Sequence, residues 1–255
     1  MAERPVVPLK SGNADGGKGP WFKIDAASKQ GQEIGKPANS RKQGAPISPL
    51  LSNLYMRRFI LGWKLGGYER RWSAHIVNYA DDLVICCKGM AHEALEAMHH
   101  LMEKLKLTIN EDKTHLCQIP QERFDFLGYT FGRCYSPVNG RSYIGTRPSQ
   151  KSIKRIVESI TAETDCRRTL LDAEYVVSRL NWKLTGWANY FCLGPVSPAY
   201  RAINSHVTKR LRRWLCRKHK VQGKGMLRYS DPYLHDVVGL VKLPIRTPDL
   251  PGAKA

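Results

Sequence analysis

The sequence predicts an α+β protein in which an antiparallel sheet with helices is followed by a bundle of α-helices. Two short β-rich runs flank Ala80-Asp81-Asp82 in the segment HIVNYADDLVICCKG, a pattern typical of a tight hairpin. After Pro148, apolar residues recur at spacings of three and four, which indicates amphipathic helices that pack as a bundle. The chain has 255 residues, 42% of them hydrophobic, so it is long and apolar enough to bury a core.

The first forty residues are rich in Gly, Pro, Ser, Asn and Lys and have neither helical nor strand periodicity. We therefore expect residues 1–42 to be a flexible leader. From Pro46 onward the pattern changes, because Pro46 and Pro49 suit a first helical turn. The apolar residues that follow at roughly helical spacing are Leu50, Leu51, Leu54, Tyr55 and Ile60.

Later elements follow from the same periodicities. An amphipathic helix is predicted over 91–107, with Leu95, Met98, Met102 and Leu105 on one stripe. The runs LTIN and RFDFLGYTFG predict strands, and a turn is expected around 136–140. Helices are predicted over 152–163, 173–191 and 198–218. The expected organisation is a sheet-containing region (43–147), a helical region (148–224) and a tail (225–255).

Charge is the most distinctive feature of the composition. The chain has 41 Lys and Arg against 22 Asp and Glu, a formal net charge of +19, and residues 141–224 contribute +13 of it. An excess of this size predicts a polyanionic partner. No apolar run approaches a membrane span, the N-terminus lacks the apolar centre of a signal peptide, and none of the seven cysteines forms a C-x-x-C pair. We expect a cytoplasmic protein with no membrane partner.

Asp81 and Asp82 are the first candidates for chemistry. Adjacent carboxylates at a hairpin tip repel each other, and a divalent cation removes that repulsion. Two-metal phosphoryl transfer uses carboxylates to hold ions about 4 Å apart. Taken alone, the pair also fits an ordinary solvated β-turn.

Three further sequence blocks accompany this hairpin. The segment Gln43-Gly44-Ala45-Pro46-Ile47-Ser48-Pro49-Leu50-Leu51-Ser52-Asn53 precedes it, and LTINEDKT (107–114) and Phe126-Leu127-Gly128-Tyr129 follow it. In this order and spacing, the four blocks resemble the reverse transcriptases encoded by bacterial group II introns, which also act as intron-splicing maturases. The segment Gly186-Trp187-Ala188-Asn189-Tyr190-Phe191 resembles the maturase, or thumb, part of that family, so the resemblance extends from residue 43 to about 240.

The resemblance implies a fold and a set of catalytic roles. The fold would be part of a polymerase palm, an antiparallel sheet with helices, followed by a helical thumb. Asp81 and Asp82 would hold Mg²⁺ in two-metal catalysis, and Lys113 would protonate the departing pyrophosphate. The alternative interpretation of Lys113 is an ordinary surface lysine. Template and incoming nucleotide would lie against Gln43, Gly44, Pro46 and Tyr79.

Other implied roles concern nucleic-acid binding. Phe126, Leu127 and Gly128 resemble a primer-grip hairpin. Intron RNA, or a duplex of RNA template and DNA primer, would contact the basic face of the last predicted helix, and dNTP would be the substrate. The residues proposed for this face are Lys209, Arg210, Arg212, Arg213, Arg217, Lys218 and Lys220. The nearby aromatics Trp182, Trp187, Tyr190 and Phe191 are expected in the bundle core rather than as base-stacking platforms.

The chain departs from the family before Gln43. The resemblance calls for another aspartate on a strand many tens of residues earlier, whereas only about forty residues precede Gln43. Phe22-Lys23-Ile24-Asp25 is the sole candidate, and we set it aside because no room remains for the intervening helices. We infer an internal deletion near residues 40–42 that removes the fingers and the first half of the palm.

Three interpretations stay open at this point. The chain is a reverse transcriptase and maturase whose truncated polymerase is inactive alone, a non-catalytic RNA-binding fragment that assists intron splicing, or a remnant without function. Under the first interpretation, a separate chain that supplies the missing part would restore polymerase activity.

Overall fold

The computed structural model describes residues 21–29, 47–80, 82–110, 114–136, 139–223 and 225–244. The chain divides into two compact units, Ala14–Phe124 and, mainly, Asp125–Ala255. We refer to them as the sheet unit and the helical unit. Together their elements form the α+β fold predicted from the sequence, with small antiparallel sheets and a helical bundle.

Antiparallel strands form the sheet of the sheet unit. They are β1 (Trp21–Lys29), β2 (His75–Tyr79), β3 (Asp82–Lys88), β4 (Thr108–Ile109) and β5 (Leu116–Ile119). Their order is β2-β3-β1-β4, and β5 also pairs with β1. The longest pairing joins β1 to β3 and runs from Trp21 opposite Lys88 to Ala27 opposite Asp82.

Strand β1 corrects an expectation from the sequence. Residues 1–42 were expected to lack strands and helices, yet residues 21–29 form the strand that connects both halves of this sheet. The segment WFKIDAASK shows little alternation of apolar and polar residues. It forms a strand because its backbone N–H and C=O groups find hydrogen-bond partners in β3 on one side and in β4 and β5 on the other.

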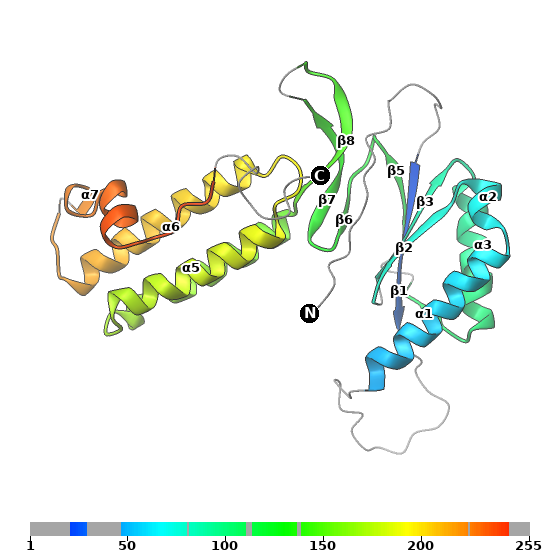
Figure 1. The fold of residues 1–255 in the computed structure, drawn as a ribbon, viewed down its shortest axis with the longest axis horizontal. Coiled ribbons are helices and arrows are strands. Elements are labelled where there is room, and N and C mark those ends of the chain that lie inside the picture. The colour runs from blue at the N-terminus through cyan, green and yellow to red at the C-terminus, as the bar shows by residue number, and fades with distance from the viewer. Residues whose placement is uncertain are drawn as a thin grey trace. The chain divides into compact units, whose positions relative to one another are not determined.

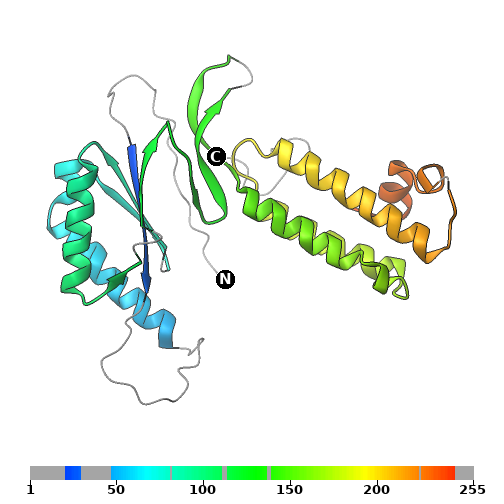
Figure 2. The ribbon, with the colours of Figure 1, turned by 180° about the vertical axis from the view of Figure 1, so that it is seen from behind.

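Helices cover one face of this sheet (Figures 1 and 2). They are α1 (Ile47–Leu65), α2 (Tyr68–Trp72) and α3 (Ala91–Lys104), so both long helices predicted in this region are confirmed. The fully buried side chains between helices and sheet include Phe59, Trp63, Leu83, Ile85, Met98 and Met102. The indole of Trp63 donates to the carbonyl of Ala74 at 2.9 Å, which satisfies its buried N–H.

A second antiparallel sheet and the main helices form the helical unit. The strands are β6 (Phe124–Phe126), which begins at the last residue of the sheet unit, β7 (Tyr129–Tyr135) and β8 (Ser142–Pro148). The helices are α4 (Gln150–Glu163), α5 (Ala173–Tyr190) and α6 (Ser197–Lys218), with the shorter η2 (Cys166–Arg168), α7 (Gly225–Arg228) and η3 (Tyr233–Val237). The predicted turn between β7 and β8 is closed by the Gly140 amide, which donates to the Ser136 carbonyl.

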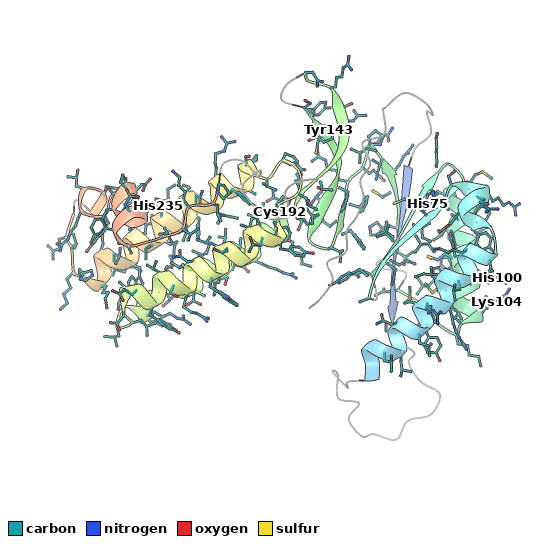
Figure 3. The ribbon with its side chains drawn as sticks, in the orientation of Figure 1. His75, His100, Lys104, Tyr143, Cys192 and His235 are labelled. Carbon is teal, nitrogen blue, oxygen red and sulfur yellow. The ribbon has the colours of Figure 1, made fainter. Side chains whose placement is uncertain are left out.

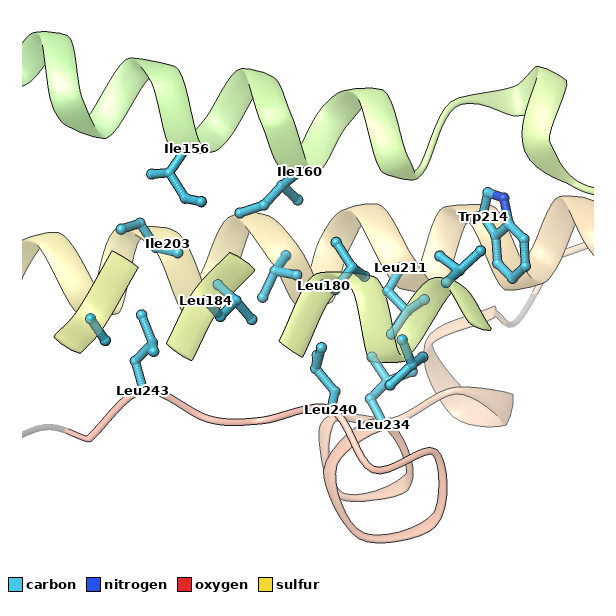
Figure 4. Packing of buried hydrophobic residues seen from close by; sticks show 14 of the residues in the cluster. Ile156, Ile160, Leu180, Leu184, Ile203, Leu211, Trp214, Leu234, Leu240 and Leu243 are labelled. Carbon is cyan, nitrogen blue, oxygen red and sulfur yellow. The ribbon is translucent and has the colours of Figure 1, made fainter. Parts of the chain in front are cut away.

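The apolar stripes of α4, α5 and α6 form the core of this unit (Figure 4). Leu180 and Leu184 of α5 are fully enclosed. The apolar residues of α6 at spacings of three and four are all buried, and they are Tyr200, Ile203, Val207, Leu211 and Trp214. Side chains from the C-terminal segment, Leu234, Leu240 and Leu243, cover the open side of the bundle. Among the described residues, no helix is long and apolar enough to cross a bilayer.

Paired amide side chains fasten that C-terminal segment. Asn204 donates to the carbonyl of Leu243 and accepts from its amide, both at 3.0 Å. Asn181 does the same with Gly239 and Val241 at 2.8 Å. Near the same segment, the His235 ring lies 2.7 Å from the Leu240 carbonyl, and Cys192 is buried where α5 leads into α6 (Figure 3).

Glu163 at the end of α4 is a buried carboxylate held by three cations. Lys183 lies 2.7 Å from it and Arg179 lies 3.4 Å from it, and Arg168 makes a third ion pair. Burial on its own raises the pKa of Glu163, but the hydrogen bond and charge of Lys183 and the two guanidinium charges outweigh it and hold the pKa below its usual value. The carboxylate therefore stays ionised and joins α4 to α5.

Leu180→Ala is expected to lower the free energy of unfolding of the helical unit by about 3 kcal/mol, because it leaves a cavity in a close-packed core. Urea denaturation followed by circular dichroism measures the change. The matched control is Leu170→Ala, a leucine that is 93% exposed, for which a change within about 0.5 kcal/mol is expected. Equal losses in the two variants would contradict this description of the core.

Candidate functional site

The predicted hairpin with adjacent carboxylates is formed by β2 and β3. Tyr79 is paired with Asp82, so the connection between the two strands is only two residues long. Ala80 has a φ of 54°, the left-handed conformation that such tight hairpins require. Asp81 itself lies outside the described residues. The turn places the end of β2 and the start of β3 side by side at one end of the sheet.

The two faces of β3 have different environments. Leu83, Ile85 and Cys87 alternate along the strand and point into the core beneath the helices. Asp82 has the opposite parity, so it belongs to the face away from the helices, and its residue is exposed. Its cross-strand neighbour Tyr79 shares that face and is 54% exposed. The hairpin thus presents an aromatic ring beside a carboxylate.

The backbone register brings Asp25 close to this hairpin. Ala27 of β1 is directly opposite Asp82, and Asp25 is two positions further along, opposite Val84. Because residues two apart in a strand belong to the same face, the position of Asp25 is on the face of Asp82. This position corrects the exclusion of Asp25, which rested on the short stretch of chain before Gln43. The sequence feature that points to Asp25 is the apolar run that it ends. This feature indicates a site residue only when the run is known to pair with β3.

Several predicted site residues lie outside the described residues. They are Gln43, Gly44, Pro46, Asp81 and Lys113. No group of three or more possible metal ligands is present in the part of the chain that the structure describes, which does not include Asp81. Their assigned roles therefore stay predictions.

The Phe126-Leu127-Gly128 segment forms a second tight turn, between β6 and β7. Leu127 and Gly128 both have positive φ, 49° and 79°. The Leu127 carbonyl accepts from the Tyr190 hydroxyl at 2.9 Å, and the Gly128 carbonyl accepts from Ser152 Oγ at 2.9 Å. The Ser149 amide also donates to the Gly128 carbonyl, at 2.9 Å. The turn is therefore fastened to the start of α4 and the end of α5.

Aromatic side chains surround this turn. Tyr129 donates its hydroxyl to the Tyr190 carbonyl at 2.5 Å, and its ring lies 5.1 Å from that of Phe191. Burial raises the pKa of Tyr129 to about 12, so the hydroxyl remains a donor at neutral pH. Phe191 is buried, as predicted. Trp182 and Tyr190 correct the expectation of core residues, because they are 72% and 54% exposed.

Four of the seven predicted RNA-binding residues form an exposed ridge on α6 and just beyond it. Lys209, Arg213 and Arg217 are four residues apart, which places them on one side of the helix about 6 Å apart along its axis. Lys220, which is also exposed, lies two residues beyond the end of the helix. We call these four residues the basic ridge. Among the described residues, none of these four side chains makes a hydrogen bond or ion pair.

The other three predicted residues are engaged inside the unit. Arg210 donates to the carbonyls of Thr161 and Thr164, both at 3.0 Å, at the C-terminal end of α4. Arg212 is buried, donates to the Tyr229 carbonyl at 2.7 Å and pairs with Asp231. Lys218 donates to the Leu171 carbonyl at 2.7 Å and to that of Thr169. Their charges stabilise the bundle, and sequence spacing alone did not separate them from the ridge.

Comparisons with known proteins agree with both units. The family model described as reverse transcriptase (RNA-dependent DNA polymerase) matches residues 22–131, which include β1 and Asp25. The model described as group II intron, maturase-specific domain matches residues 151–230. Together they cover about three quarters of the chain. No curated protein matches the sequence.

Gly128→Ala is expected to lower the free energy of unfolding by about 3 kcal/mol. A Cβ at this position would lie 2.9 Å from Ser152 Oγ and 3.1 Å from the Phe191 ring, and the backbone is left-handed. The control is Gly140→Ala, which has a similar φ of 66° and no atom within 4 Å of its Cβ, so only about 1 kcal/mol is expected. Urea denaturation measures both. A difference near zero would mean that the turn is not held by the helices.

Proposed function

We propose that this chain, which belongs to the reverse transcriptases and maturases of group II introns, binds intron RNA through its helical unit and retains polymerase carboxylates in its sheet unit. The family implies nucleic-acid substrates and the use of a divalent metal. As a polymerase we propose that the chain is truncated and inactive alone. The observation that most supports this proposal is the register of β1 and β3, which brings Asp25 to the hairpin of Asp82.

The residues at this end of the sheet fit a divalent cation by their chemistry. We propose that Asp25, Asp81 and Asp82 hold two Mg²⁺ ions, since Mg²⁺ prefers carboxylate oxygens. The register supports including Asp25, because its position shares a face with Asp82. When bound, the metal would stabilise the negative charge that develops during phosphoryl transfer.

The surrounding residues would position the nucleic acid. Tyr79, exposed beside Asp82, offers a flat ring on which a base or sugar could rest. Gln43, Gly44 and Pro46 would line the template and nucleotide side, and Lys113 would protonate the leaving pyrophosphate. The fastened turn of Phe126, Leu127 and Gly128 would hold the primer, since its backbone is fixed by α4 and α5.

The connection between β1 and α1 supports the proposed inactivity. Only residues 30–46 separate Lys29 from Ile47, where the resemblance calls for many tens of residues. We propose that the deletion lies in this connection and removes the segments that close over the triphosphate. Correct placement of the nucleotide accounts for much of the rate of phosphoryl transfer, so its loss is expected to abolish polymerisation.

The chain alone is expected to give no primer extension on an RNA template with a DNA primer, dNTP and Mg²⁺. An intact enzyme of the family serves as the positive control for the assay. Extension above background that disappears in Asp81→Ala would contradict the proposed inactivity and establish an active polymerase.

Metal binding tests the carboxylates independently of extension. Mn²⁺ titration followed by electron paramagnetic resonance is expected to show binding that Asp25→Asn and Asp82→Asn each weaken at least tenfold. Asp236→Asn, an aspartate of the helical unit, is the control and should leave Mn²⁺ binding unchanged. If Asp25→Asn behaves like the control, Asp25 is not part of the site.

Substitution of the basic ridge is expected to weaken binding to group II intron RNA. The double variant Arg213→Gln/Arg217→Gln removes two phosphate contacts, so the slope of log K against log salt should fall by roughly 1.5. The matched control is Lys151→Gln/Lys154→Gln, which removes the same charge from exposed positions on α4. Filter binding at several salt concentrations measures the slopes.

The outcome that contradicts an RNA-binding ridge is an equal effect of the two double variants, which would indicate net charge alone. A specific maturase is also expected to bind intron RNA more tightly than an unrelated structured RNA of equal length. Equal affinity for both RNAs would remove the support for specific recognition.

A further inference from the structure

Helix α1 of the sheet unit is apolar on two sides. Its inner side is formed by Met56, Phe59 and Trp63, which are buried against the sheet and α3. The opposite side has a second set of large apolar residues at helical spacing. These residues, which we call the outer stripe, are Leu50, Leu51, Leu54, Tyr55, Leu61 and Leu65.

The outer stripe is exposed along the whole helix. Its least exposed member is Tyr55 at 40%, and Leu65 at the end of the helix reaches 87%. Single exposed leucines are ordinary, but a helix that is apolar all round is normally buried on all sides. A row of large exposed apolar residues of this kind marks an interaction surface.

Two arginines interrupt the middle of the outer stripe. Arg57 and Arg58 are exposed, and neither side chain makes a hydrogen bond or ion pair with another described residue. Leu54 precedes them and Leu61 follows them on the same side of the helix. A partner that covers the stripe must therefore bury or approach two positive charges at its centre. Carboxylates opposite these guanidinium groups satisfy that requirement, because unpaired charges are costly at an interface.

The position of the arginines disfavours a second copy of the chain. In a two-fold dimer the same patch contacts itself, so a dimer that buries the stripe from Leu50 to Leu65 is centred between residues 57 and 58. Arg57 of one protomer would then meet Arg58 of its partner, and the reverse. Four guanidinium groups would gather at the axis with no carboxylate on the stripe to compensate.

We propose that the outer stripe of α1 binds an amphipathic helix of a different polypeptide, with apolar residues along one side and carboxylates at its middle. Leucines at helical spacing fit the apolar side of a helix, as in helix-in-groove recognition, and the arginines set its register. An RNA partner would pair with the arginines but would leave the leucines exposed. The proposal does not depend on polymerase or intron-RNA binding activity of the chain.

The test uses the whole chain and two synthetic peptides labelled with fluorescein. Each has about 16 residues, a helix length of about 24 Å that matches the stripe, with leucines along one side. One peptide has two glutamates at its centre and the other has two lysines there. Fluorescence anisotropy is expected to show at least tenfold tighter binding of the glutamate peptide.

Charge reversal provides the decisive variant. Arg57→Glu/Arg58→Glu keeps the leucines and is expected to invert the preference, so that the lysine peptide binds at least tenfold more tightly. The control Arg70→Glu/Arg71→Glu makes the same charge change in α2 and should leave the original preference intact. Because the readout is a change in preference, a variant that merely loses stability cannot imitate it.

Three results would overturn the proposal. One is equal affinity of the unchanged protein for both peptides. Another is a dimer in sedimentation experiments that Leu54→Glu disperses, which would assign the stripe to a second copy. The third is displacement of the glutamate peptide by a short RNA, with loss of RNA binding in Leu54→Glu, which would assign the stripe to nucleic acid.

Discussion

The pairing of β1 with β3 is the interaction on which the sheet unit depends. It joins the hairpin that contains Asp82 to β4 and β5, so without it the unit would have two small unconnected pieces of sheet. The same register decides which residues lie beside the carboxylates. A shift of one residue would move Asp25 to the helix-covered face, where an unpaired carboxylate is costly. Structure and proposed chemistry therefore rest on one set of backbone hydrogen bonds.

The helical unit fixes a turn in a similar way. Leu127 and Gly128 have conformations that are unfavourable for most residues, and the bonds from Tyr190, Ser149 and Ser152 compensate for that cost. These donors come from the start of α4 and the end of α5, so the turn is positioned by the helices whose core is shown in Figure 4. A loss of core packing is thus expected to loosen the turn and also to lower the stability of the unit.

Positive charge in the helical unit has two separate uses. Arg210 and Lys218 saturate backbone carbonyls at the ends of neighbouring elements, and Arg212 pairs with Asp231. The basic ridge is left to solvent because four-residue spacing keeps it on the side of α6 away from the core. A large net charge therefore overstates the surface available to RNA. In the sheet unit, the outer stripe of α1 joins exposed arginines to leucines, a composition better suited to a protein helix.

The sequence alone determined the α+β class, the main helices and the hairpin of Tyr79 and Asp82, because helical and strand periodicities and turn residues act over a few positions. It also identified the family, because the four sequence blocks and their order can be read directly from the chain. Only the tertiary structure decided that residues 21–29 form a strand, that Trp182 is exposed and that Arg212 is buried. Each of these outcomes depends on partners far away in the chain. The periodicity within a segment does not indicate which distant residues will pack against it or form hydrogen bonds with it.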